Sequence, residues 1–492
     1  MRRTLEAAFS AAVAAADPAA VLPPHLPRDL PDAPSGRVIV VGAGKAAEPM
    51  ARAAAEHLRR HYPRVRLQGL VVAPHLPPGL APAATVGEAE AVSVLRGAHP
   101  VPDEAGVAAT RRVMELAAGA GAGDLVLVLL SGGGSALLTA PAGISLERKA
   151  ALTRALLASG ATIHELNTVR KHLSEVKGGR LAALATRNGA NLLTLAVSDV
   201  AGDDASTIAS GPTVPDPSTY QDALRVVERH APHMSDVLAA LRAGADGLRP
   251  ESPKPGDERL KRTRYVLVAD PGRSLAAAKA VLERAGVTVA DLGAALEGEA
   301  RVVGAEHAAW VREQVRGRNA ADGPMALLSG GELTVTLRAA DAERGGLFSK
   351  GRGGPNGEYA LGLVRALMRA DSAAGSANPT SALGGAGGDL YVLAADTDGL
   401  DGGGSALSGP EGPAEDLEMG PFAERTGFDD GAAGALFGPE QLARFEPGEV
   451  ERALEAHDSH GYLQRTGGLY LTGPTGTNVN DLRIVLLAPA ER

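Results

Sequence analysis

The chain has 492 residues, a length that predicts two or three domains at roughly 100–200 residues each. Hydrophobic residues make up 45% of it and charged residues 22%, which is the composition of a globular protein. The net charge of −9 and the aromatic content of 3% argue against a nucleic-acid partner, which needs basic surface and stacking side chains. There is no cysteine, so disulfides and thiolate chemistry are excluded and a cytoplasmic location is expected. No apolar run approaches the ~18 residues of a membrane span, so we expect no membrane partner.

The first half of the chain predicts a parallel sheet. An amphipathic helix is expected first, because Leu5, Phe9 and Val13 recur at a spacing of four. Apolar runs then end in a glycine-rich or Ser-Asp loop, with helical spacing between them. Strand, turn and helix in repetition indicate βαβ units, and hence a sheet covered by helices on both faces. The runs are 37–41, 124–130 and 191–197.

The second half predicts another α/β domain. A proline-rich polar stretch over 249–262 reads as a linker, which divides the chain into domains 1–250 and 251–492. Adjacent apolar runs at 325–328 and 333–337 predict a hairpin, so the second sheet should be mixed. The fold class is therefore α/β, with two three-layer α/β/α domains. We expect a Rossmann-like, mostly parallel N-terminal sheet and a smaller mixed C-terminal sheet, with 402–428 as a surface insertion.

The clearest candidate ligand loop follows the second apolar run. Three successive glycines allow backbone N–H groups to crowd around a ligand, and the start of the next helix offers unpaired donors. The loop therefore predicts a site for a phosphate or a carboxylate, although a tight strand-to-helix turn without a ligand is the alternative. It is not a Walker A loop, because no Gly-Lys-Ser/Thr follows. Its residues are Ser131, Gly132, Gly133, Gly134, Ser135 and Ala136.

A second glycine turn, Gly42-Ala43-Gly44, precedes Lys45. A dinucleotide-binding fingerprint would want glycine near position 47, where the chain has Ala47, and alanine is tolerated there in some folds. A lysine beside such a turn is suited to neutralise a transferring phosphoryl group. A lysine that only points to water is the alternative.

Acidic loops follow two predicted strands. Asp199 lies in the first, over 198–204, and Asp398 lies in the second, over 395–402. Magnesium takes one or two carboxylates together with substrate oxygens, so these residues are candidate metal ligands. Aspartate is also a favoured helix N-cap, which is the structural alternative.

Several further polar residues are candidates for binding. Asn167 and Lys171 share a polar stripe on a predicted helix over 163–177, and such a stripe is usually solvated. A glycine-rich basic loop over 349–358 carries Arg352 and Asn356. The remaining candidates in loops are His99 and Asn478.

Taken in order, these motifs resemble the glycerate 2-kinases of the MOFRL type, some of which are named hydroxypyruvate reductases. The resemblance covers most of the chain. It rests on residues 41–46, 99–103, 130–137, 167–174, 177–179, 198–204, 208–213, 297–300, 329–332, 397–399 and 472–481.

The resemblance implies a two-domain kinase with its active site in the cleft between domains. The implied reaction is ATP plus D-glycerate giving ADP plus 2-phosphoglycerate, with Mg²⁺. The family's catalytic lysine falls on Lys45, and its site includes the loop 132–135, Asn167, Asp199 and Asp398. Asp199 or Asp398 would then orient magnesium or accept the hydroxyl proton. The sequence does not decide the oligomeric state, and a homodimer is one assembly that it allows.

The chain departs from the family at one functional position. Members commonly read Gly-Gly-Arg-Asn-Gln-Glu where this chain has residues 353–358, so the family arginine is replaced by Pro355. We expect Arg352, three residues upstream, to take over its catalytic role. Three other functions are alternatives to a glycerate 2-kinase. They are an NAD(P)-dependent hydroxypyruvate reductase, a kinase of a related small hydroxy acid, and a binding protein that has lost catalysis.

Overall fold

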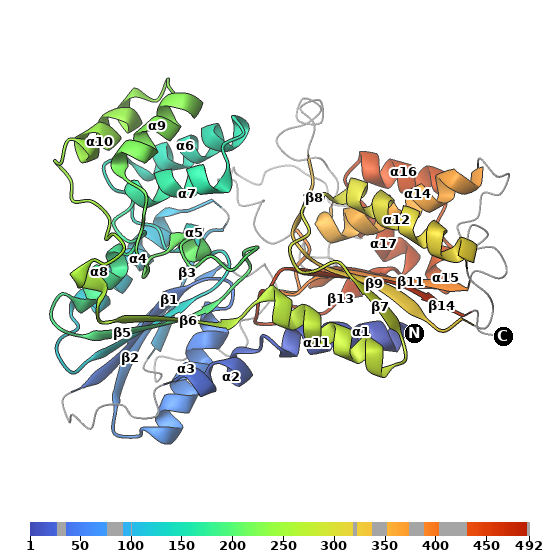
Figure 1. The fold of residues 1–492 in the computed structure, drawn as a ribbon, viewed down its shortest axis with the longest axis horizontal. Helices are drawn as coiled ribbons and strands as arrows, with labels where there is room; N and C mark the ends of the chain where they lie inside the picture. The colour runs from blue at the N-terminus through green and yellow to red at the C-terminus, as the bar shows by residue number, and fades with distance from the viewer. Residues whose placement is uncertain are drawn as a thin grey trace, which may run out of the picture.

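The computed structural model describes residues 1–26, 36–75, 92–99, 101–317, 322–336, 352–372, 388–402 and 431–489. These residues form two α/β units that lie side by side, each built on its own six-stranded sheet (Figure 1). The insertion expected at 402–428 lies, apart from its first residue, outside the described residues.

The first unit contains a parallel sheet in the strand order β3-β2-β1-β4-β5-β6. This is the Rossmann order, and it confirms the predicted parallel sheet. Helices and short turns cover both faces, because the central strands are apolar on both sides. The strands are β1 (Arg37–Ala43), β2 (Arg66–Pro74), β3 (Val92–Gly97), β4 (Leu125–Leu130), β5 (Asn191–Val197) and β6 (Thr263–Ala269). The surrounding helices are α2 (Pro18–Val21), η1 (Pro23–His25), α3 (Ala47–His61), α4 (Glu104–Ala118), α5 (Gly134–Leu137), α8 (Arg180–Thr186), η2 (Ile208–Ser210) and η3 (Glu258–Leu260).

Four further helices of the first unit gather in a separate layer above α4, α5 and α8 (Figure 1). They share a small apolar core of their own. Helix α7 begins at a capping box, in which Thr162 accepts from the backbone of Glu165 and the Glu165 carboxylate accepts from the backbone of Thr162. The four are α6 (Leu146–Ala158), α7 (Ile163–His172), α9 (Tyr220–His230) and α10 (Ser235–Ala245).

The second unit contains a mixed sheet in the order β13-β12-β11-β14-β9-β7, antiparallel except for the β7–β9 pair. The predicted mixed character is confirmed, but the prediction of a smaller sheet is wrong, because this sheet has six strands like the first. Its strands are β7 (Thr288–Asp291), β9 (Met325–Gly331), β11 (Asp389–Asp396), β12 (Ala432–Phe437), β13 (Leu469–Leu471) and β14 (Asp481–Ala488). One face is covered by α1 (Arg2–Ala14) and α11 (Pro271–Arg284). The other is covered by α12 (Ala300–Gly317), α14 (Pro355–Ser372), α15 (Pro439–Leu442), α16 (Pro447–Glu455) and α17 (Ser459–Thr466).

The predicted hairpin is wrong. Strand β9 pairs with β14 and β7, whereas β10 (Leu333–Thr334) pairs in parallel with β8 (Gly298–Glu299). Gly331 takes a φ of +103° and closes against Leu296, so the chain leaves the sheet there instead of turning back along β9.

The two sheets divide the chain differently from the expected break near residue 250. The stretch 249–262 connects α10 to β6 inside the first unit, with Ser252 buried and hydrogen-bonded to Asp216. Helix α1 comes first in the chain but packs against α11 and the second sheet (Figure 1). Among the described residues no single helix is long and apolar enough to cross a membrane; α1 and residues 18–25 reach that threshold only together, as a bent pair.

Candidate functional site

The site is built at the point where the strand order of the first sheet reverses, between β1 and β4, which is where α/β sheets bind ligands. The loops after these strands are joined to each other. The Lys45 N–H donates to the Gly132 carbonyl at 2.8 Å, and the Ala46 N–H donates to Ser131 Oγ at 2.9 Å. Gly44 has to be glycine, since a Cβ there would lie 2.1 Å from Ser131 Oγ. The two glycine loops therefore form one rigid surface.

Lys45 contacts the second unit. Its Nζ lies 2.5 Å from Asp398 Oδ2, and the other oxygen, Asp398 Oδ1, accepts from the Leu400 N–H at 2.8 Å. Burial by itself would lower the pKa of the Lys45 amine, but Asp398 and Asp396 outweigh that effect and hold the pKa well above its usual value. The amine is therefore fully charged at neutral pH.

Asp199 forms a second connection between the units. It follows β5, and its Oδ2 accepts from Asn478 Nδ2 of the second unit at 3.2 Å. A Cβ on Gly132 would lie 1.9 Å from that same oxygen, so the glycine leaves the space in which the carboxylate sits. Burial raises the pKa of Asp199, and Lys45 opposes this effect.

Three more carboxylates gather at the opposing edge of the second sheet. Asp396 at the end of β11 is the register partner of Asp481 at the start of β14, which is in turn opposite Gly331 at the end of β9. Glu332 follows directly in the chain, and part of this residue is exposed to solvent. Burial, followed by Asp398, raises the pKa of Asp396 well above its usual value. Partial burial together with Asp199 and Asp481 raises the pKa of Glu332 to about 7.

Asp481 and Glu332 were not predicted as site residues, and Asp396 was predicted only as part of the acidic loop 395–402. A signal was present, because Glu332 and Asp481 both lie in motifs that carry the family resemblance and Glu332 ends a Ser-Gly-Gly-Glu segment after a strand. The pairing of β11, β14 and β9 at one edge was the missing information.

The polar residues of α7 divide into two groups. Asn167 is brought to the glycine loop, because Ser210 Oγ lies 3.3 Å from Asn167 Oδ1 and 2.9 Å from Ser135 Oγ. Lys171 is instead paired with the buried Asp216 at 3.5 Å and donates to Ser206 Oγ at 3.1 Å.

His99 lies beside the glycine loop, where its Nε2 would be 3.2 Å from a Cβ on Gly133. Burial, followed by the nearby charge of Lys45, lowers the pKa of His99 to about 4, so the ring is neutral at physiological pH. Gly42 is explained by strand packing, since a Cβ would lie 2.0 Å from the Leu129 carbonyl oxygen. Ala136 is buried in α5, and its binding role stays a prediction.

Asn356 lies in the first turn of α14, and Arg352 lies in the loop before that helix. Asn356 is almost completely buried, and its Nδ2 donates to Asp481 at 2.8 Å. The Arg352 guanidinium lies 3.1 Å from His460 Nε2, and its backbone N–H donates to Asp458 at 3.1 Å. These contacts join the loop before α14 to α17, and the catalytic role expected for Arg352 stays a prediction.

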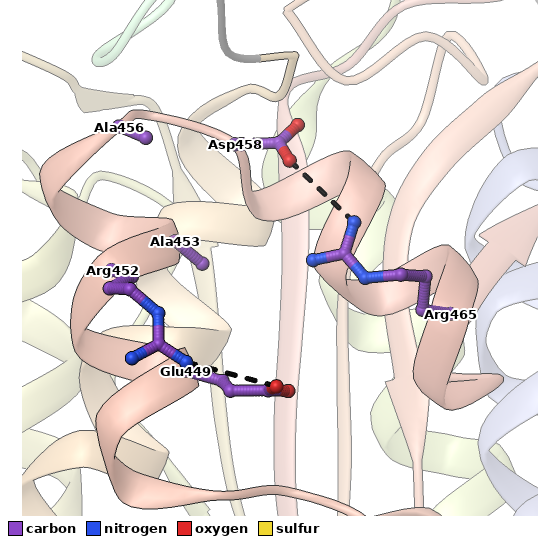
Figure 2. Close-up of a pocket in the computed structure, with 6 residues that line it drawn as sticks. All are labelled: Glu449, Arg452, Ala453, Ala456, Asp458 and Arg465. Atoms are coloured by element: carbon purple, nitrogen blue, oxygen red, sulfur yellow. Dashed lines mark ion pairs between the residues drawn. The ribbon is translucent and has the colours of Figure 1, made fainter.

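A cavity of about 220 Å³ lies elsewhere, between α16 and α17 (Figure 2). Its charged residues pair with each other, Arg452 with Glu449 at 3.8 Å and Arg465 with Asp458 at 3.9 Å. Because its lining comes from these two helices and their connection, it is separate from the loops that carry Lys45 and Asp199.

A Rossmann-ordered sheet that presents a charged lysine to a carboxylate-rich edge of a second sheet defines the chain as a two-domain α/β enzyme. The MOFRL family description matches residues 325–410 and 426–481, and the description "Domain of unknown function (DUF4147)" matches residues 4–242. By its identity to full-length relatives, the chain belongs to the MOFRL-containing glycerate 2-kinase family.

Full-length relatives support this assignment. D-glycerate 2-kinase of Thermotoga maritima is 36% identical over 460 residues, which cover 93% of this chain and 92% of the relative. A protein of Agrobacterium vitis that bears a hydroxypyruvate reductase name is 39% identical, with 99% and 94% covered. The crystal structure of the Thermotoga maritima glycerate kinase superposes with a TM-score of 0.71 at 33% identity and covers 99% of both chains.

Proposed function

We propose that the protein transfers the γ-phosphoryl group of ATP to the 2-hydroxyl of D-glycerate, giving ADP and 2-phosphoglycerate. The observation that carries this proposal is the position of Lys45, which is fully charged at the switch point of the first sheet and contacts Asp398 of the second unit. A fixed positive charge there stabilises the negative charge of a phosphoryl group in transfer. The kinase names of the full-length relatives support the same reaction.

The carboxylates of the site suit the acceptor side of the reaction. The 2-hydroxyl oxygen forms a bond to the γ-phosphorus while the bond to the bridging oxygen of ADP breaks, and the hydroxyl proton has to leave. Asp199 or Asp398 would accept this proton. Burial raises the pKa of Asp199, which makes that carboxylate a better base than a solvated aspartate.

Magnesium fits the donor set of this site. Three carboxylates, those of Asp398, Asp396 and Asp199, lie near the Lys45 amine, so acidic groups outnumber the cation there. Within the described parts of the chain no group of three or more His, Cys, Asp or Glu residues could hold a metal ion. For Mg²⁺, which takes one or two carboxylates together with phosphate oxygens, we propose Asp199 and Asp398 as ligands. When bound, Mg²⁺ supplies positive charge that offsets the phosphates.

Release of ADP from ATP, Mg²⁺ and D-glycerate tests the proposal. We expect Lys45→Ala to lower kcat at least ~10²-fold, because it removes the charge that faces the transferring group. Lys279→Ala is the matched control, since Lys279 pairs with Asp291 on α11 and β7 at 3.2 Å and should leave kcat unchanged. ADP release by the wild type no faster than by Lys45→Ala would refute the kinase proposal. Phosphorus–proton coupling in the NMR spectrum of the product distinguishes a 2-phosphate, on a CH group, from a 3-phosphate, on a CH₂ group.

The other readings predict different results. A hydroxypyruvate reductase, the name borne by the Agrobacterium vitis relative, would oxidise NADH or NADPH in the presence of hydroxypyruvate. A kinase of another small hydroxy acid would release ADP with that acid and not with D-glycerate. A binding protein without catalysis would be stabilised by ligands without turnover. A cytoplasmic location and a homodimer remain parts of the proposal that fractionation and light scattering would test.

A further inference from the structure

The turn that contains η2 is strained at two successive residues. Ala209 has a φ of +51° and Ser210 a φ of +59°, followed by Gly211 at +60°. Alanine and serine rarely adopt this left-handed region, and strained backbone is retained where the surrounding structure enforces it. Ala209 and Ser210 are both buried.

Two neighbouring elements enforce this conformation. The N–H groups of Gly178 and Gly179, which precede α8, donate to the carbonyls of Ser210 at 3.2 Å and of Gly211 at 2.8 Å. On the other side, Gly134 approaches so closely that its Cβ would lie 2.8 Å from Ala209 Cβ. The turn is therefore fixed between α8 and the glycine loop.

The strained backbone places one hydroxyl between two candidate ligand-binding residues. Ser210 Oγ lies 3.3 Å from Asn167 Oδ1 and 2.9 Å from Ser135 Oγ. An amide oxygen can only accept, so Ser210 gives its single proton to Asn167. The Asn167 amide is then oriented with its NH₂ group as the end that is free to turn toward a ligand. Ser135 in turn donates its proton to Ser210, which leaves Ser135 Oγ as an acceptor.

The hydrogen-bond donors and acceptors of Asn167 and Ser135 distinguish between ATP and the hydroxy acid as the ligand of this pair. The pair offers a donor at Asn167 Nδ2 and an acceptor at Ser135 Oγ. Phosphate oxygens of ATP at neutral pH chiefly accept, whereas a hydroxy acid has a carboxylate that accepts and a hydroxyl that donates. The acceptor–donor pair therefore matches the hydroxy acid better than the triphosphate.

We infer that Ser210 is a positioning residue that orients Asn167 and Ser135 for the carboxylate and a hydroxyl of D-glycerate. The inference rests on the proposed function for the identity of the substrate. Ser210 itself, fully buried behind these two residues, acts through them.

Steady-state kinetics of Ser210→Ala, Asn167→Ala and the double variant test the inference. Ser210→Ala should raise the KM for D-glycerate about ten-fold and leave the KM for ATP within about two-fold, as expected for loss of one oriented hydrogen bond. Because Ser210 acts in part through Asn167, the rise in the KM for D-glycerate in the double variant should be well below the product of the two single effects.

The control is Thr186→Val, which removes another buried hydroxyl of the first unit, one that donates to the carbonyls of Ala182 and Arg259. It should leave both KM values unchanged. Four outcomes would each overturn the inference. Two concern Ser210→Ala: an unchanged KM for D-glycerate, or a rise in the KM for ATP instead. The others are KM effects that multiply in the double variant, and an equal rise in the KM for D-glycerate in Thr186→Val.

A thermal-shift experiment with D-glycerate separates this inference from the proposed function. Stabilisation of the wild type by D-glycerate without turnover would refute only the kinase, and Ser210→Ala should then reduce the shift. Turnover with an unchanged KM in Ser210→Ala would refute only the role of Ser210. Wild type that neither binds nor turns over D-glycerate would refute both.

Discussion

Gly132 determines where Asp199 lies, and this can be tested at the scale of one residue. A Cβ at Gly132 would lie 1.9 Å from Asp199 Oδ2 and 2.5 Å from Asn478 Nδ2, so alanine has to displace both side chains. We expect Gly132→Ala to lower kcat/KM for D-glycerate at least ten-fold while the free energy of unfolding falls by only about 1 kcal/mol. The control is Gly121→Ala, because a Cβ there meets nothing within 4 Å. Full activity of Gly132→Ala would show that the position of Asp199 does not matter.

Because the pKa of Glu332 is raised in the folded protein, the free energy of unfolding should depend on pH. Partial burial and the neighbouring carboxylates Asp199 and Asp481 raise its pKa from an ordinary 4.5 to about 7 in the folded protein. Between these two values the folded chain holds a proton that the unfolded chain has released, so this group makes the protein less stable as the pH rises from about 4.5 to 7. Urea unfolding at pH 5 and pH 8 measures this effect.

Glu332→Gln should remove this contribution. Relative to the wild type, the variant should gain stability at pH 8 and not at pH 5. Glu449→Gln, on the surface of α16, is the control and should show no such pH-dependent gain. A gain of equal size at both pH values would contradict the assigned titration.

Helix α1 is an element whose position in the chain does not indicate its position in the fold. Leu5, Phe9 and Ala12 are buried against α11 and the second sheet, and the Phe9 ring meets the Tyr470 ring edge-on at 5.3 Å. Removing a buried phenylalanine costs about 3–5 kcal/mol. We expect Phe9→Ala to destabilise the second unit by that amount in urea unfolding. Ser10→Ala, on the exposed side of α1, should change stability by less than about 0.5 kcal/mol.

The order of β9 and β10 shows what local sequence can say about an element. Both segments were predicted to be extended, and both contain strands. Their pairing was wrong, because a short connection usually makes a hairpin and nothing in the segment reveals that β8 and β14 are the true partners. Pairing is decided by the whole sheet.

At the scale of the whole molecule, ligand binding should depend on charge contributed by both units. ATP is a polyanion, and the edge of the second sheet presents Asp396, Asp398, Asp481 and Glu332. ATP with Mg²⁺ should therefore raise the Tm of the protein far more than ATP with EDTA. In Asp398→Asn the extra stabilisation by Mg²⁺ should be reduced, whereas Asp236→Asn, which removes a surface partner of Arg148, should keep it. Equal shifts with and without Mg²⁺ would contradict the proposed metal site.

Most of the strands and the glycine loops could be predicted from the sequence alone. Apolar runs that end in glycine are local features, so the strand before Lys45 and the one before Ser131 could be recognised, and parallel βαβ order followed from them. The family motifs then indicated Asp199 and Asp398. These features depend on side-chain periodicity and turn geometry within about ten residues.

Only the tertiary structure decided which residues meet. Lys45 and Asp398 are 353 positions apart, and Asp199 and Asn478 are 279 apart, yet each pair is in contact. Arg352 lies against His460 because α14 and α17 pack together, a placement that its spacing from Pro355 does not encode. Contacts of this kind depend on how complete sheets and helices pack together. No short segment of the sequence therefore reveals them.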